Sequence, residues 1–185
     1  RHAAGHDSEI SYPQSGILPA SQLRKMLERG EDISDFAPEC DFSEIALISN
    51  LETAILSKLR SMTKAEIEKT PNVLLGLENR IYRAAGVAGS LNELYFLVKT
   101  KRYTLARIRR IILSAFLGIT KNDLHFSNSY VRILGMNGKG REILAAAKCD
   151  IPLNTSLSQL EKTSEKAKKQ ARLEARCGDQ YALAF

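Results

Sequence analysis

Apolar side chains recur at steps of three and four residues along most of the chain beyond residue 20, a spacing typical of amphipathic helices. The clearest apolar stripe consists of Ile48, Leu51, Ile55 and Leu59. It follows Asp41-Phe42-Ser43-Glu44, in which an acceptor side chain and a Glu three residues later form a capping box. The pattern predicts a helix that begins beside this box and buries the stripe.

Two further capping boxes predict helices in the next part of the chain. Thr63-Lys64-Ala65-Glu66 starts a short helix, and Ser90-Leu91-Asn92-Glu93 starts one that continues to residue 98. Between these boxes, the apolar positions of residues 75–85 predict another helix. Gly86 and Gly89 are expected to end it, because glycine is a poor helix former.

The strongest helical pattern begins at Thr104. Its inward-facing residues lie about one helical turn apart: Leu105, Ile108, Ile112, Ala115 and Phe116. At about 100° per residue, Arg107 and Arg110 fall on the side opposite this stripe, whereas Arg109 flanks it. We therefore expect a helix that turns an apolar face to the core and projects Arg107 and Arg110 into solvent.

A minor β element is expected after this helix. The alternation over residues 130–134 predicts a strand, Asn137-Gly138 predicts a turn, and residues 141–148 predict a short helix. A glycine-rich loop over residues 135–140 matches neither common phosphate-binding pattern, so we interpret it as the connection between strand and helix.

The chain is predicted to close with a helix over residues 165–177, which follows a polar link over 154–164 and ends at Gly178. The predicted class is mainly α, a helical bundle domain with a minor β element near residues 129–153. A cluster of lysines on the closing helix is interleaved with Glu165 and Glu174 and is interpreted as a solvated face.

The charge distribution changes this picture by indicating a partner. The chain has 185 residues, 44% hydrophobic and 26% charged, which is ordinary globular composition and excludes a wholly disordered class. Its net charge of +6 is uneven, because residues 99–148 hold 11 basic and 2 acidic side chains whereas residues 1–45 hold 4 and 9. Such a basic block favours a face that binds a polyanion. The alternatives are a solvated cationic face, or one that docks an acidic protein or residues 1–45 of a second copy.

Other chemistries find little support. The three cysteines and three histidines show no metal-ligand or triad spacing, so we predict no metal site and no catalytic residue, and thiols kept in a reducing cytoplasm. The longest nearly apolar run, residues 111–119, is about half of the ~20 residues that a membrane helix needs, so no membrane partner is expected. Glu78 is interpreted as a helix-packing residue in an interhelical ion pair rather than as an acid or base.

The candidate nucleic-acid contacts are basic residues and one aromatic residue in the block: Lys99, Lys101, Arg102, Tyr103, Arg107 and Arg110, extended by Arg132, Lys139 and Arg141. Lysine and arginine contact phosphates, and a tyrosine ring can stack on an unpaired base. Tyr103 could instead be a packing residue at the start of its helix.

Three stretches together resemble one family. They are residues 97–110, with Lys99-Thr100-Lys101-Arg102-Tyr103 and the arginines that follow, residues 130–144, and Gly76-Leu77-Glu78-Asn79-Arg80-Ile81. In this order they resemble the C-terminal half of the bacterial tRNA(Met) cytidine acetate ligases, which are nucleotidyltransferase-like proteins. Two N-terminal stretches are also similar to that family, residues 1–7 and 17–24, although Pro19 replaces a serine of the family pattern and Ser21 a threonine.

The resemblance implies an enzyme that activates acetate with ATP and acetylates N4 of the wobble cytidine in elongator tRNA(Met). It implies that residues 1–30 are the end of a nucleotide-binding α/β domain, with Arg1 from the ATP site, and that residues 31–185 form a helical tRNA-binding domain. The nucleotide motif of the family is not found in this sequence. We therefore expect the chain to need a missing N-terminal nucleotide-binding domain and to be inactive alone, with no cofactor of its own. A non-catalytic protein- or RNA-interaction domain is the alternative.

Overall fold

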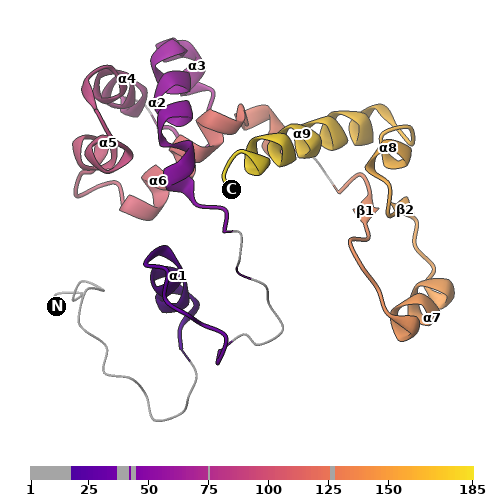
Figure 1. Ribbon diagram of the computed structural model, residues 1–185. Coiled ribbons are helices and arrows are strands. Elements are labelled where there is room, and N and C mark those ends of the chain that lie inside the picture. Colours follow the sequence, from indigo (N-terminus) through magenta and orange to yellow (C-terminus); the bar gives the residue numbers. More distant parts are fainter. Residues whose placement is uncertain (1–17, 37–41, 43–44, 75, 126–127) are drawn as a thin grey trace, which may run out of the picture. The chain divides into compact units, whose positions relative to one another are not determined.

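The computed structural model describes residues 18–36, 42, 45–74, 76–125 and 128–185 (Figure 1). Contacts divide the chain into two compact units, Arg1–Leu47 and Ile48–Phe185. The described part of the first unit contains α1 (Ala20–Glu28). The carbonyl of Pro19 accepts hydrogen bonds from the backbone N–H groups of Gln22 (2.9 Å) and Leu23 (3.2 Å), so Pro19 precedes a helix start. Whether residues 1–30 are the end of a nucleotide-binding domain stays a prediction.

The second unit begins with a helical bundle. Its elements are η1 (Ile48–Leu51), α2 (Glu52–Ser61), α3 (Lys64–Glu68), α4 (Leu77–Val87), α5 (Leu91–Val98), α6 (Leu105–Leu117) and η2 (Lys121–His125). α4 packs against α2, α3 and α5, and α6 packs against α2 and α5. The largest apolar side chains between these helices are at most 2% exposed: Ile55, Leu59, Ile67, Leu77, Ile81, Leu94, Ile108, Ile111 and Ile112. Burial of each contributes about 1.5–3 kcal/mol, so this core holds the bundle together.

The first predicted helix starts later than its capping box suggests. Asp41, Ser43 and Glu44 lie outside the described residues, and the α-helix begins only at Glu52, after a 3₁₀ turn. A 3₁₀ turn has three residues per turn rather than 3.6, which shifts the positions that share a face. Ile48 is therefore 45% exposed, and the buried stripe begins at Leu51.

The other two predicted caps are present. Thr63 and Glu66 form the reciprocal box: Thr63 Oγ1 accepts from the Glu66 N–H (3.3 Å), and Glu66 Oε2 accepts from the Thr63 N–H (2.7 Å). Ser90 Oγ accepts from the Glu93 N–H (3.1 Å), but the Glu93 carboxylate accepts from the Gly89 N–H (2.8 Å) instead of returning to Ser90. Local hydrogen bonds therefore set both helix starts.

Two glycines that were expected to end helices do not. α4 continues through Gly86 to Val87, and α9 (Glu165–Ala182) continues through Gly178. Glycine ends a helix when it adopts the left-handed conformation, as Gly118 does after α6 with a φ of 67°. A helical glycine costs only about 1 kcal/mol relative to alanine, which the packing of a helix can offset.

The minor β element is confirmed as a two-stranded parallel sheet. β1 (Val131–Arg132) pairs with β2 (Leu153–Asn154), with Val131 opposite Leu153, and α7 (Gly138–Ala146) lies between them in the chain (Figure 1). The predicted turn at Asn137-Gly138 is instead the start of α7, because Asn137 Oδ1 accepts a hydrogen bond from the Gly140 N–H (2.9 Å). The predicted polar link over 154–164 contains the short helix α8 (Leu157–Leu160).

A small second core joins the sheet to the last two helices. Tyr130, Leu160, Ala167 and Ala171 are buried together, with Leu157 packed against them. Two long-range hydrogen bonds then tie the end of the chain to the bundle: Arg176 Nη2 donates to the Gly118 carbonyl (3.3 Å) and Asn50 Nδ2 to the Ala184 carbonyl (2.8 Å). Within the described residues, no helix is long and apolar enough to cross a membrane.

Candidate nucleic-acid interface

The basic segment, defined as residues Lys99–Arg110, runs from the end of α5 into α6. An arginine of a neighbouring helix holds its beginning. Arg80 of α4 donates from Nε to the Leu97 carbonyl (2.9 Å) and from Nη2 to the Lys99 carbonyl (3.3 Å). Carbonyls at a helix C-terminus have no partner inside the helix, so Arg80 satisfies them and brings positive charge to the negative end of α5.

Two threonines shape the rest of the connection. Thr100 Oγ1 accepts hydrogen bonds from the backbone N–H groups of Arg102 and Tyr103, both at 3.2 Å. Thr104 is the N-cap of α6, and its side chain accepts from the Arg107 N–H (3.4 Å). Hydrogen bonds thus hold both ends of the connection between α5 and α6.

Tyr103 is a packing residue in this structure. Its side chain is 7% exposed, and the guanidinium groups of Arg102 and Arg107 lie 5.8 Å and 5.4 Å from the ring centroid. At these distances a guanidinium group is attracted to the ring by a cation–π interaction, so both groups stay beside one ring. A base could stack on Tyr103 only if these side chains moved, so the geometry favours the packing alternative.

Arg107 does not simply project into solvent as the helical pattern predicts. It is half-buried, and its Nη2 donates to the carbonyl of Asn72 (2.9 Å), a residue in the left-handed region with a φ of 64°. Its Nε is buried and has no hydrogen-bond partner among the described residues. Its position on α6 turns Arg107 away from the apolar face of that helix. The loop between α3 and α4, which contains Asn72, covers Arg107 there.

The other arginines of α6 differ from one another. Arg109 lies over the ring of Tyr95, 5.6 Å from its centroid, and has no ion pair within the described residues. Burial raises the pKa of the Tyr95 hydroxyl, so this residue stays neutral beside the arginine. Arg110 is exposed and has no hydrogen bond or ion pair within the described residues. Arg110 therefore has the free guanidinium that the pattern predicts.

Five cations of the basic segment are exposed and unpaired by any acid in the described part of the chain: Lys99, Lys101, Arg102, Arg109 and Arg110. No acidic residue lies in the first turn of α6, where the helix dipole is positive. The segment thus presents a fixed positive field to solvent. Anions with several phosphates match such a surface, because lysine and arginine both bind phosphate.

The structure places the three additional candidates elsewhere in the unit. Arg132 of β1 forms an ion pair with Glu174 of α9 (2.6 Å), and Tyr130 donates its hydroxyl to the same carboxylate (2.8 Å). Burial alone would raise the pKa of Glu174, but the bonds from Arg132 and Tyr130 outweigh it and lower that pKa. Lys139 and Arg141 are exposed in the first turn of α7.

Glu78 is a buried packing residue without the ion pair that we expected. It is 8% exposed, Oε1 accepts a hydrogen bond from Asn79 Nδ2 (2.7 Å), and Oε2 has no partner among the described residues. The predicted interhelical ion pair is therefore wrong for the described residues, since the nearest polar partner comes from the adjacent position in the same helix.

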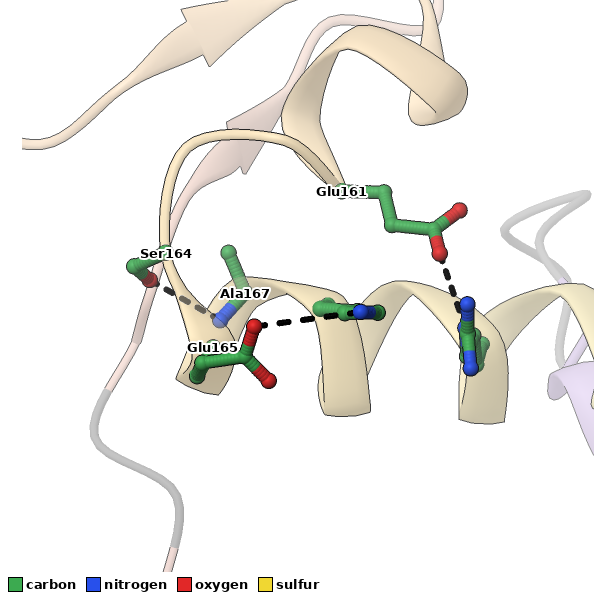
Figure 2. Close-up of polar contacts among 6 residues, drawn as sticks. Glu161, Ser164, Glu165 and Ala167 are labelled. Carbon is green, nitrogen blue, oxygen red and sulfur yellow. Dashed lines mark hydrogen bonds and ion pairs between the residues drawn. The ribbon is translucent and has the colours of Figure 1, made fainter.

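The lysine-rich face of α9 is solvated and its cations lie beside acids, as predicted; two of these acids, Glu161 after α8 and Glu165 of α9, are labelled in Figure 2. Glu161 pairs with Arg172 (2.8 Å) and Glu165 with Lys168 (3.8 Å), while Ser164 caps the helix by accepting from the Ala167 N–H (3.1 Å). Exposed pairs of this kind contribute 0–1 kcal/mol at most, typically ~0.5. Because its cations are interleaved with acids, this face is a weaker match to a polyanion than the basic segment.

Sequence reasoning missed the residues that position this segment. Arg80 and Asn72 lie 17 and 35 residues from the groups that they bind, so no local pattern indicates these contacts. Within the described ranges, no group of three or more His, Cys, Asp or Glu side chains is placed to hold a metal ion. Arg1, the residue implied for an ATP site, lies outside the described residues.

Comparison with known families identifies the class of protein. The family model of the HIGH nucleotidyl transferases matches residues 1–185. The chain belongs to this family. Because the match spans every residue, it does not by itself place the chain in the C-terminal part of a family member, as the resemblance implied.

Its relatives include tRNA(Met) cytidine acetate ligases. The ligase of Alkaliphilus metalliredigens is 40% identical over an alignment that covers 98% of this chain and 47% of the relative, and that of Clostridium perfringens strain SM101 is 36% identical over 80% and 39%. Crystal structures of Thermotoga maritima TmcAL match with TM-scores of 0.76 for the apo form and 0.81 for the form bound with alpha-thio ATP. The apo structure is 28% identical, over 89% of this chain and 45% of TmcAL. The structure bound with alpha-thio ATP is 29% identical, over 91% of this chain and 47% of TmcAL. The chain spans less than half the length of these relatives.

Proposed function

We propose that this chain is the tRNA-binding, C-terminal portion of a tRNA(Met) cytidine acetate ligase. The family match and the named relatives support the ligase family. The observation that carries the binding role is the basic segment, where Lys99, Lys101, Arg102 and Arg110 are exposed and free of acidic partners in the described residues. Arg80, Thr100 and Thr104 hold the backbone that carries them.

In this proposal the full-length ligase activates acetate with ATP and forms N4-acetylcytidine at the wobble position of elongator tRNA(Met). The solved TmcAL bound with alpha-thio ATP supports ATP use in the family. We assign ATP binding and acetate activation to the full-length protein in the cytoplasm, with Arg1 as the one ATP-site residue of this chain. The chain alone then binds tRNA without acetylating it.

The test is binding of the chain to elongator tRNA(Met) and to a second tRNA by fluorescence anisotropy across a range of salt concentrations. We expect affinity that falls steeply with salt, because each neutralised phosphate releases counterions. Arg110→Glu should weaken binding and lower the salt slope by about 1. Lys169→Glu makes the same charge change at an exposed residue of α9 and is the matched control.

Each outcome has a definite meaning. Tighter binding to elongator tRNA(Met) supports substrate recognition by these residues, and equal binding of both tRNAs supports only a contact to the RNA backbone. A chain that binds neither tRNA, or an Arg110→Glu variant that binds as well as the wild type, contradicts the proposal. Salt-sensitive self-association in light scattering without RNA would favour the protein-interaction alternative.

A further inference from the structure

A groove lies between α4 and α5, directly beside the basic segment. Its volume is about 540 Å³, and its lining includes Asn79, Arg80, Arg83, Ala84, Val87 and Leu97. Val87 is 70% exposed although it is apolar. Val87 and the half-buried Leu97 thus give the groove an apolar surface, to which Ala84 adds little because it is 5% exposed. The polar side chains add hydrogen-bonding groups.

The charge of the groove has one sign. Among the described residues, its charged lining residues are Arg80 and Arg83, and no acidic side chain lines it. Arg80 donates to the carbonyls of Leu97 and Lys99, whereas Arg83 is exposed and has no hydrogen bond or ion pair among the described residues. An apolar surface flanked by free positive charge suits a ligand that has both a flat apolar part and a negative part.

The groove is continuous with the basic segment through one side chain. Arg80 lines the groove and also binds the backbone carbonyl of Lys99, the first residue of the segment. A polyanion that contacts Lys99 and Lys101 therefore passes next to the groove. In RNA the flat part and the negative part are the base and the phosphate, which alternate along one strand.

Paired and unpaired RNA differ in what they can place here. Bases in a duplex are stacked and paired, so their faces are hidden, whereas an unpaired base in a loop can enter a groove. Asn79 offers polar contact for such a base: its Nδ2 donates to Glu78 Oε1 (2.7 Å), which orients the amide and leaves Oδ1 as an acceptor.

We propose that the groove between α4 and α5 binds one unpaired base of an RNA whose phosphates contact the basic segment. Arg83 contacts the phosphate or the face of that base, Val87 and Leu97 contact the base, and Asn79 accepts a hydrogen bond from a base amino group. This inference rests on the proposed function and adds a preference for single-stranded over paired RNA.

The test compares a hairpin RNA that has a single-stranded loop with a fully paired duplex of equal charge. The wild-type chain should bind the hairpin more tightly. Val87→Glu and Arg83→Gln should each weaken hairpin binding by about 5- to 150-fold, which corresponds to the ~1–3 kcal/mol lost when the stacking of one base is removed, and should reduce that preference. Phe96→Glu, at an apolar side chain of α5 that is 78% exposed and does not line the groove, is the matched control for charge.

The outcomes separate the two proposals. If the groove variants lower hairpin and duplex affinity equally, or behave like Phe96→Glu, the groove does not bind a base and this inference is overturned while RNA binding stands. If the wild type binds neither RNA, the proposed function fails and this inference fails with it. Circular dichroism of each variant confirms that α4 and α5 are still folded.

Discussion

The guanidinium of Arg80 in α4 donates a 2.9 Å hydrogen bond to the carbonyl of Leu97 in the last turn of α5. This contact satisfies a helix-end carbonyl and, with the second bond to Lys99, fixes where the basic segment leaves α5. The same side chain lines the groove beside the segment. One arginine therefore positions both surfaces for which we propose RNA contacts.

Replacing Arg80 should affect stability and binding together. Arg80→Met keeps the apolar stem but removes both hydrogen bonds, so we expect a loss of about 1 kcal/mol in the free energy of unfolding. RNA affinity should fall as well, because the basic segment loses its support. Urea denaturation and anisotropy measure the two effects. Arg83→Met is the control for stability and should leave the unfolding midpoint unchanged, since no partner of Arg83 exists among the described residues.

The arginines of α6 should separate into structural and free groups. Arg107→Glu removes the bond to Asn72 and the contact with Tyr103, so it should lower stability by about 1–2 kcal/mol. Arg110→Glu should leave stability within about 0.5 kcal/mol of the wild type. Thermal unfolding of both variants checks this prediction. If Arg107→Glu also stayed within about 0.5 kcal/mol of the wild type, Arg107 would make no structural contribution.

The contact between β1 and α9 should depend on pH through Glu174. Its pKa lies below the ordinary value of 4.5, so its contribution to stability is present above that pH and is lost as the pH falls through the folded value. The stability difference between the wild type and Glu174→Gln should therefore be largest near neutral pH and shrink in acid. Denaturant titrations at several pH values measure it. Glu165→Gln, on the exposed face of the same helix, should show a smaller difference; a constant difference for Glu174→Gln would contradict the assignment.

The core of the bundle should be sensitive to truncation at α4. Ile81 is fully buried, so Ile81→Ala should cost about 2–5 kcal/mol in the free energy of unfolding. Val87→Ala on the same helix removes apolar atoms from a site that is 70% exposed and should cost less than about 0.5 kcal/mol. Urea denaturation of the two variants gives both values. Similar costs would mean that α4 does not bury the face that contains Ile81.

Patterns within a few residues predicted much of the bundle. The caps at Thr63, Ser90 and Thr104 and the buried positions Ile55 and Ile108 follow from hydrogen bonds and apolar contacts one turn apart. The predictions failed at glycines, which can either end a helix or continue it. Gly86 and Gly178 continue their helices, since a glycine ends a helix only if the chain adopts the left-handed conformation there.

The candidate site was predictable as a composition and not as a geometry. The excess of cations over acids in residues 99–148 can be counted in the sequence, and this excess favours a polyanion as the binding partner. The sequence does not indicate which of these cations are free of partners. Arg107 is bound by Asn72, 35 residues away, and Arg132 by Glu174, 42 residues away. Contacts at such separations depend on how the helices pack.

The sequence by itself determined the mainly helical class, the helix starts at Thr63, Ser90 and Thr104, and the position of the basic block, because each depends on neighbouring residues. Only the tertiary structure decided that Arg80 supports the segment, that Arg107 donates to the Asn72 carbonyl, and that a groove opens between α4 and α5. These features require carbonyls and side chains from separate parts of the chain to meet. Packing of the core brings them together, and no short stretch of sequence encodes it.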